Sequence, residues 1–126
     1  MATWAIDFDH TLHDPEDRAP GYRMGRPIPG AAEALRALKA AGDTIIIHTM
    51  RARPYKREVI GGVEYENSAK HVEEWLNYFG IPFDEVTAIK PMADAYVDDK
   101  AVHFHGDWDD TRRLLEAIRQ NEHHRK

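Results

Sequence analysis

Three consecutive isoleucines constrain the fold of this chain more than any other feature. Ile45, Ile46 and Ile47 lie between Asp43 and Thr49, and β-branched residues favour strands. The run does not alternate with polar residues, as a strand with one face in water would. Such a run is typical of a strand in a parallel sheet that is covered on both faces. We therefore expect a buried strand over 43–49.

Strand-like and helix-like segments alternate along the rest of the chain. Ala31, Leu35 and Leu38 recur at the spacing of one helix face, and Gly42 stands where a helix commonly ends. Two later segments have the same helical spacing. The predicted strands span 2–8, 43–49, 86–89, 95–97 and, at an edge, 102–104, and the predicted helices span 31–42, 68–79 and 111–119.

The two later helices each have one apolar face. Asn67 or Ser68 is expected to cap the first of them, whose apolar face comprises Val72, Trp75, Leu76 and Phe79. The last helix is expected to turn Leu114, Leu115 and Ile118 inward, and residues 121–126 to form a frayed tail. This alternation predicts an α/β class: a three-layer Rossmann-like fold with a mostly parallel central sheet, in a single domain over 1–126.

Composition excludes several classes of function. The 126 residues include no cysteine and carry a formal charge of −5. Without cysteine there is no disulfide, cysteine nucleophile or thiolate metal site. The acidic balance disfavours broad nucleic-acid binding, which usually requires an excess of Lys and Arg. Asp7 and Asp9 interrupt the N-terminal apolar run, so we expect no signal peptide, no membrane span and a cytoplasmic location.

Polar side chains gather where the predicted strands end. Asp7 and Asp9 follow the first strand, and Thr49 ends the second. Open α/β sheets bind ligands beyond the carboxyl ends of their strands, so these side chains are expected to face one crevice. Carboxylate oxygens together with substrate phosphate are ligands that Mg²⁺ prefers. The full set, which suits a phosphoryl group beside a magnesium ion, is Asp7, Asp9, Thr49, Lys90, Asp98 and Asp99.

At these positions the sequence resembles the haloacid dehalogenase superfamily of phosphotransferases, along almost its entire length. DFDHTL at 7–12 resembles the first motif of the superfamily, and IIIHT, which ends at Thr49, resembles the second. Lys90-Pro91 resembles the third motif, and the apolar strand before Asp98-Asp99 resembles the fourth. The stretches GRPIPGA, WL-x₃-GIP-x-D and KP-x-AD-x-Y-x-DD are similar to small uncharacterised or capsular-biosynthesis-type phosphatases of this superfamily.

The resemblance implies an Mg²⁺-dependent phosphatase, a phosphoric monoester hydrolase that acts through an aspartyl-phosphate. It makes Asp7 the nucleophile and Asp9 the general acid and base, roles that fit an ionised carboxylate and a second carboxyl beyond the strand. Thr49 and Lys90 would hold the phosphoryl oxygens. The implied metal ligands are Asp7, the backbone carbonyl of Asp9, Asp98 and, as an alternate ligand, Asp99.

The spacing of the motifs leaves no room for the cap domain that many members carry. Residues 51–67 are expected to form a flexible substrate loop instead, with cations at Arg51, Arg53, Lys56 and Arg57. A solvated charge run is the alternative explanation of these cations. The predicted substrate-binding residues are His10, Thr49, Met50, Arg51, Arg53 and Lys90, although His10 could equally point to solvent. An open site predicts either a large substrate, such as a nucleic-acid end, or a small sugar phosphate covered by a second subunit.

Three other interpretations stay open. A catalytically inactive domain of the same fold would bind phosphate without turnover. A signalling receiver also clusters Asp, Thr and Lys around Mg²⁺, but its acidic pair precedes the other residues, whereas here Asp98-Asp99 follows Lys90. His103 and His105 have a spacing that could suit zinc on a strand, although no third ligand is evident.

Overall fold

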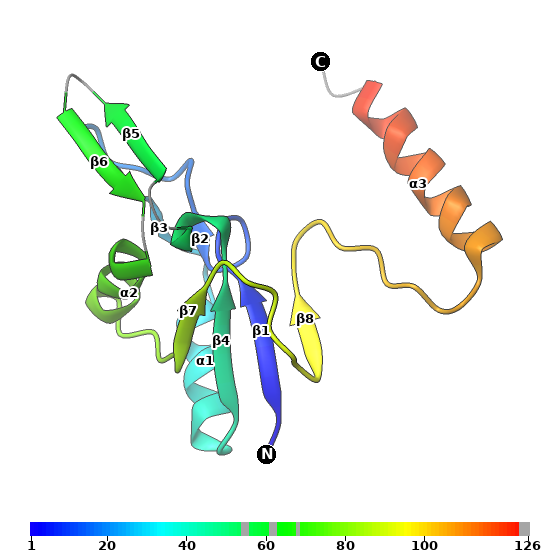
Figure 1. The fold of residues 1–126 in the computed structure, drawn as a ribbon, viewed down its shortest axis with the longest axis horizontal. Helices are drawn as coiled ribbons and strands as arrows, with labels where there is room; N and C mark the ends of the chain where they lie inside the picture. The colour runs from blue at the N-terminus through cyan, green and yellow to red at the C-terminus, as the bar shows by residue number, and fades with distance from the viewer. Residues whose placement is uncertain (54–55, 61–62, 68, 124–126) are drawn as a thin grey trace.

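The centre of the molecule is a four-stranded parallel sheet (Figure 1), seen in a computed structural model that describes residues 1–53, 56–60, 63–67 and 69–123. The strands are β1 (Thr3–Asp7), β4 (Thr44–His48), β7 (Glu85–Thr87) and β8 (Ala95–Val97), in the order β7-β4-β1-β8. Every pair is parallel, so the carboxyl ends of all four strands meet at one edge. The predicted α/β class and the mostly parallel Rossmann-like sheet are confirmed.

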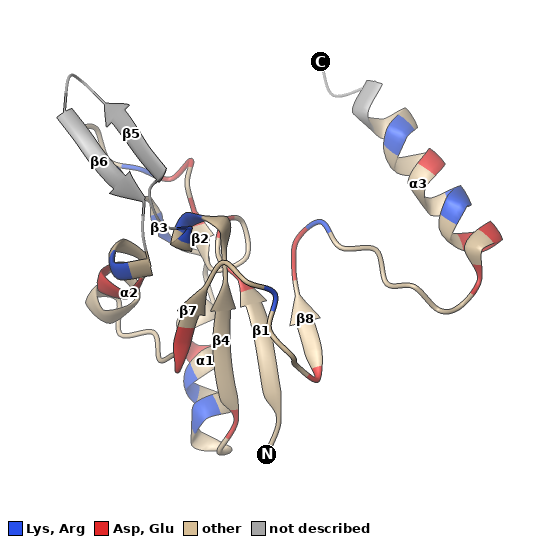
Figure 2. Cartoon of the chain, in the orientation of Figure 1, with Lys and Arg blue, Asp and Glu red and all other residues tan. Residues whose placement is uncertain are grey.

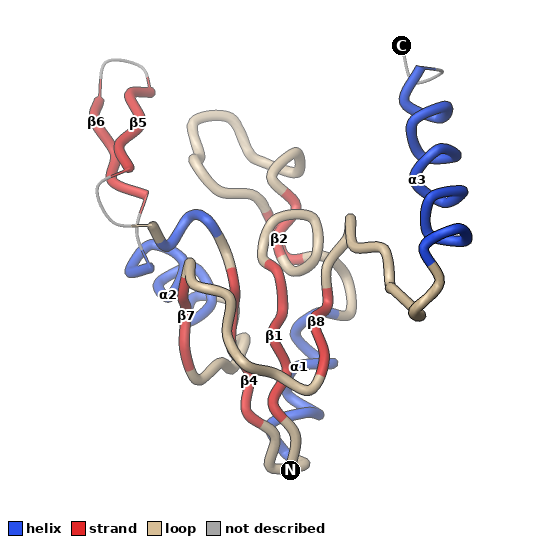
Figure 3. The backbone as a smooth tube through the Cα atoms, turned by 45° about the vertical axis from the view of Figure 1, so that its right-hand side comes forward, coloured by secondary structure: helices blue, strands red, loops and turns tan. Residues whose placement is uncertain are grey.

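Two crossover helices cover one face of this sheet. α1 (Ala31–Ala40) connects β1 to β4, and α2 (Ala69–Tyr78) connects β4 to β7. The core between helices and sheet includes Ile6, Phe8, Leu35, Ile45, Ile47, Val72, Trp75 and Leu76. Ala5 and Ile46 alternate with these residues and are buried on the opposite face, which the connection from β7 to β8 crosses (Figures 1 and 3). The isoleucine run is therefore buried on both faces, as predicted.

Short elements fill segments that sequence periodicity assigns to loops. β2 (His13–Asp14) and β3 (Arg26–Pro27) pair antiparallel between the first predicted strand and the first predicted helix, and η1 (Met50–Ala52) is a single 3₁₀ turn. Within 51–67, β5 (Lys56–Ile60) and β6 (Val63–Asn67) form an antiparallel pair. The prediction of a loop missed these strands, because residues 51–67 show no sustained alternation of apolar and polar residues. The glycines at 61–62 and the Lys56 and Arg57 side chains lie outside the described residues.

The last helix, α3 (Trp108–His123), stands apart from the sheet in both views (Figures 1 and 3). Leu114, Leu115 and Ile118 are 44%, 45% and 53% exposed, so the prediction that they face inward is wrong in this structure. Helical spacing shows that a helix has an apolar face but not which surface covers it. α3 continues through 121–123, which were predicted to fray, while 124–126 lie outside the described residues.

The predicted edge strand at 102–104 does not form. These residues belong to the segment that joins β8 to α3, and an isolated strand has no neighbour to accept its backbone hydrogen bonds. His103 and His105 therefore lie in a loop, with their ring centroids 4.4 Å apart. In the part of the chain that the structure describes, no helix has the length and apolar character needed to cross a bilayer.

Candidate functional site

Three carboxylates converge at the carboxyl edge of the sheet. Asp7 ends β1, and Asp98 and Asp99 directly follow β8; Figure 2 shows this acidic segment beyond β8. Because β1 and β8 pair in parallel with Ile6 opposite Val97, the residues that follow each strand meet. One carboxylate oxygen from each of the three lies within 4.8 Å of the others. Of the described residues, no other group of three or more acidic or histidine side chains is placed to hold a metal ion.

The electrostatics of Asp7 reflect this crowding. Burial raises the pKa of the Asp7 carboxyl from 3.8 to about 6, against an opposing hydrogen bond at the Phe8 backbone. The carboxylates of Asp98, Asp99 and Asp9 contribute to the same rise, because each disfavours a further negative charge. A cation among these oxygens would offset that repulsion. The donor set fits Mg²⁺, since it offers only oxygen, and the exposure of Asp98 and Asp99 leaves room for waters.

Asp9, the second carboxylate of the first motif, is held by two side chains rather than by the acidic cluster. His13 Nδ1 lies 2.8 Å from Asp9 Oδ1, and Arg51 Nε donates to Asp9 Oδ2 over 2.7 Å. Burial alone would raise the pKa of Asp9, but the hydrogen bonds from His13 and Arg51 outweigh it and lower the pKa to about 2. Asp9 is therefore an ionised carboxylate with both oxygens engaged.

His13 is a site residue that the sequence analysis missed. Its side chain is completely buried, although histidine is uncommon in such positions. The only sequence signal was its place four residues after Asp9 in the same loop. Nothing else in the local sequence between Leu12 and Asp14 indicates a buried histidine.

Only some residues at and after the second motif lie close to the first motif. Thr49 is buried, and its hydroxyl accepts a hydrogen bond from the Arg51 backbone N–H over 3.2 Å, which caps η1. Arg51 points to Asp9, with Nη1 3.7 Å from the sulfur of Met24. Met50 and Arg53 are exposed beside it. The structure thus brings Thr49 and Arg51 to the first motif, but shows no contact of Met50 or Arg53 with the acidic residues.

Among the described residues, no hydrogen bond or ion pair joins Lys90 or His10 to the three carboxylates. The Lys90 ammonium is 4.7 Å from the ring centroid of Tyr96, whose hydroxyl donates to the Pro91 carbonyl over 2.7 Å. His10 is exposed and has a φ of 65°, a left-handed conformation that glycine adopts more readily than other residues.

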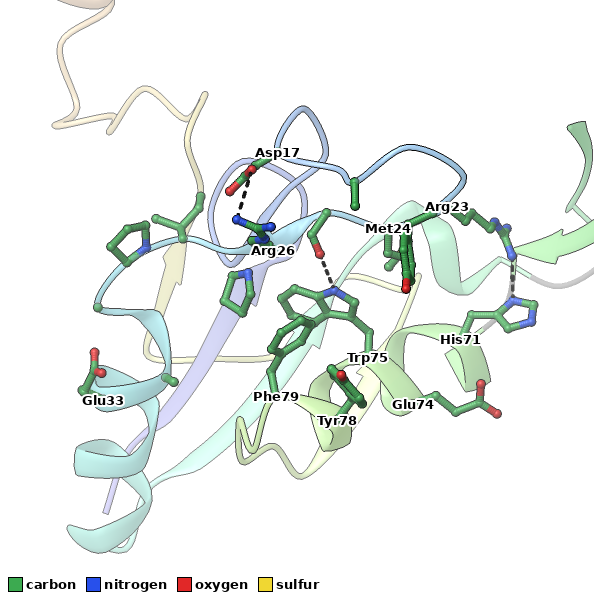
Figure 4. Close-up of a pocket in the computed structure, with 18 residues that line it drawn as sticks. Asp17, Arg23, Met24, Arg26, Glu33, His71, Glu74, Trp75, Tyr78 and Phe79 are labelled. Carbon is green, nitrogen blue, oxygen red and sulfur yellow. Dashed lines mark hydrogen bonds and ion pairs between the residues drawn. The ribbon is translucent and has the colours of Figure 1, made fainter.

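A cavity of about 1000 Å³ lies on the helical side of the molecule (Figure 4). It runs between the 17–30 segment, the start of α1 and α2, with Trp75, Tyr78 and Phe79 on one wall. Trp75 Nε1 donates to the Gly25 carbonyl over 2.9 Å. None of the three clustered carboxylates lines this cavity; Asp98 and Asp99 are instead exposed at the sheet edge.

The sequence matches no established protein family and no curated protein. Its fold is similar to the solved structure of a conserved protein from Bacteroides thetaiotaomicron, with a TM-score of 0.55 and 23% sequence identity. The similarity covers 93% of this chain and 91% of that one. At this level of identity the comparison shows the shared α/β fold alone.

Proposed function

We propose that this chain is an Mg²⁺-dependent phosphomonoester hydrolase with Asp7 as its nucleophile. The observation that carries the proposal is the convergence of Asp7, Asp98 and Asp99 within 4.8 Å at the ends of two adjacent parallel strands. Three carboxylates in a shared crevice are costly for stability, as the raised pKa of Asp7 reflects, and a divalent cation relieves that cost. The order of the four motifs along the sequence supports the same reaction.

In the proposed reaction an oxygen of Asp7 attacks phosphorus and the bond to the leaving oxygen breaks, which leaves an aspartyl-phosphate. The leaving oxygen takes a proton from Asp9. A water molecule then attacks the phosphorus, gives its proton to Asp9 and releases Asp7 and phosphate. When bound, Mg²⁺ offsets the negative charge of Asp7 and of the phosphoryl oxygens.

The contacts of Asp9 suggest how the substrate engages the site. An Asp9 paired with Arg51 is ionised, which suits its role as a base but not as an acid. We propose that the phosphoryl group draws the Arg51 guanidinium away, because arginine binds phosphate oxygens through two parallel hydrogen bonds. Asp9 then loses a cationic partner and can carry the proton that the leaving group needs. Thr49 and Lys90 complete the proposed phosphate contacts.

The experiment compares purified wild-type protein with Asp7→Asn in hydrolysis of p-nitrophenyl phosphate with Mg²⁺. We expect Asp7→Asn to lower turnover by at least about 1,000-fold with an unchanged circular dichroism spectrum, because an amide is a poor nucleophile and metal ligand. Asp110→Asn, an exposed residue in the first turn of α3, is the matched control and should retain activity. Near-wild-type turnover by Asp7→Asn, or activity in EDTA, would contradict the mechanism.

A catalytically inactive phosphate-binding domain is the second candidate. Two observations favour it: the Lys90 ammonium lies over the Tyr96 ring, and the Arg51 guanidinium is paired with the Asp9 carboxylate. A panel of phosphorylated metabolites and nucleic-acid ends separates the two functions. Calorimetric binding of Mg²⁺ and inorganic phosphate without hydrolysis of any member of the panel would establish the inactive domain.

A further inference from the structure

Four residues contact the His13 ring: Asp9, Gly25, Phe8 and Trp75. Nδ1 faces Asp9, and on the other side of the ring Nε2 accepts a hydrogen bond of 2.7 Å from the Gly25 backbone N–H. Since Nε2 is an acceptor, the ring proton is on Nδ1, which donates it to Asp9 Oδ1. The tautomer follows from the backbone of the β2–β3 segment.

Aromatic packing holds the plane of the ring. The Phe8 ring stacks on His13 with centroids 4.9 Å apart and planes 13° apart, while Trp75 meets it edge-on at 5.2 Å. Trp75 also bonds the Gly25 carbonyl, so the residue that sets the tautomer is itself held at both its N–H and its C=O. These contacts hold the His13 ring in one orientation relative to Asp9.

The two partners of Asp9 differ in how firmly they are fixed. The His13 side chain is 0% exposed, whereas the Arg51 side chain is 24% exposed and lies on a 3₁₀ turn at the open edge of the site. Arg51 can exchange partners when an anion enters, and His13 cannot. His13 would then be the fixed contact on Oδ1, leaving Oδ2 free to face the substrate.

We propose that His13 is a positioning residue, which orients the Asp9 carboxyl so that Oδ2 exchanges a proton with the leaving oxygen. This inference rests on the proposed phosphomonoesterase function. It assigns His13 no contact with substrate or metal. Its effect is greatest where the leaving group most needs a proton, because an acidic phenol departs without help and a weakly acidic one does not.

Two conservative variants separate the donor of His13 from its acceptor. His13→Asn places an amide N–H near the former Nδ1 and keeps the donor to Asp9, but it loses the acceptor for Gly25. His13→Gln places an amide oxygen near the former Nε2 and keeps the acceptor, but it loses the donor. Both remove the ring and its aromatic packing, so a purely structural role would affect them alike.

The variants are compared in kcat and KM with Mg²⁺ on p-nitrophenyl phosphate and phenyl phosphate, which differ in the acidity of the leaving phenol. We expect His13→Gln to lose at least about tenfold more kcat on phenyl phosphate than on p-nitrophenyl phosphate. His13→Asn should recover most of that difference. Asp9→Asn should show the steepest dependence on the leaving group. Equal losses on both esters, or equal impairment of the two His13 variants, would overturn the inference.

A second measurement keeps the test decisive if a variant does not fold. In ¹⁵N-labelled wild-type protein we expect the His13 ring to carry its proton on Nδ1, with a resonance that shifts in Asp9→Asn. A proton on Nε2, or no shift, would overturn the inference. If the wild type hydrolyses neither ester, the proposed function fails and this inference with it; if it hydrolyses both and His13→Gln responds equally, the inference alone fails.

Discussion

At the scale of single residues, the two carboxylates of the first motif have opposite surroundings. Burial and neighbouring carboxylates raise the pKa of Asp7 to about 6, whereas His13 and Arg51 lower that of Asp9 to about 2 despite its burial. Arg51 gives Asp9 a cationic partner, whereas the charged groups that act on Asp7 are carboxylates. Such a separation of two pKa values is common where two neighbouring carboxyl groups have different catalytic roles. The contrast supports the proposed Mg²⁺ site at Asp7.

We predict that Mg²⁺ stabilises the protein more at neutral pH than in mild acid. Because the pKa of Asp7 is raised on folding, its favourable contribution to stability is full below 3.8 and is lost as the pH rises through about 6. Mg²⁺ binds the ionised form and restores that stability. Thermal melts at about pH 4.5 and about pH 7.5 should show the larger Mg²⁺-induced rise in Tm at the higher pH.

Asp7→Asn is the control for this prediction, because it removes the titrating group. In EDTA, raising the pH between the same two values should stabilise Asp7→Asn relative to the wild type. Asp9 does not interfere, since its lowered pKa affects stability only at more acidic pH. An equal Mg²⁺ effect at both pH values would count against the acidic site as the place where the ion binds.

At the scale of elements, the β2–β3 segment links the core to the site. The Gly25 backbone contacts both His13 and Trp75, and a side chain at this position would overlap the backbone oxygen of Asp14. The segment therefore requires glycine for close backbone approach rather than for a positive φ. The conformation of this segment therefore fixes the His13 ring, which contacts Asp9.

We predict that Gly25→Ala destabilises the protein by more than about 2 kcal/mol, because the backbone around Asp14 must shift to make room. Gly21→Ala in the same segment is the matched control. Its φ is +84° and nothing lies within 4 Å of an added Cβ, so it should cost only about 1 kcal/mol of conformational strain. Urea denaturation measures the free energy of unfolding of both variants. Equal losses of stability would show that the Gly25 backbone has room to move.

At the scale of the whole molecule, the two crossover helices α1 and α2 cover the same face of the sheet. The connection from β7 to β8 crosses the other face, while α3 stands away with an exposed apolar face (Figure 3). Trp108 and Ile118 on α3 are 69% and 53% exposed. The structure implies that α3 adds little to the stability of the sheet and its two packed helices.

We predict that the double change Leu115→Asp and Ile118→Asp alters the free energy of unfolding of the sheet by less than about 0.5 kcal/mol, as expected for exposed positions. Leu76→Ala in α2, where the side chain is fully buried, is the control and should cost about 2–5 kcal/mol. Urea denaturation followed by tryptophan fluorescence compares them. A loss in the double variant as large as that of Leu76→Ala would show that this face of α3 is buried in solution.

Local sequence determined the strands, the crossover helices and the edge where the acidic residues meet. Ile45, Ile46 and Ile47 required a strand buried on both faces, and parallel pairing then brings Asp7 and Asp98 together at the carboxyl ends of their strands. These features follow from periodicity and strand direction, which are local properties of the chain. The acidic cluster could therefore be predicted without knowledge of any loop.

Tertiary structure alone decided the partners of Asp9 and the placement of α3. Arg51 is 42 residues from Asp9 in sequence, and Gly25 selects the tautomer of His13 only because the β2–β3 segment folds back on the first motif. Such contacts depend on loop conformation, for which no sequence period exists. α3 forms the predicted amphipathic helix, yet its apolar face is exposed. Amphipathicity is a property of the local sequence, whereas the surface that covers a helix is set by the tertiary structure.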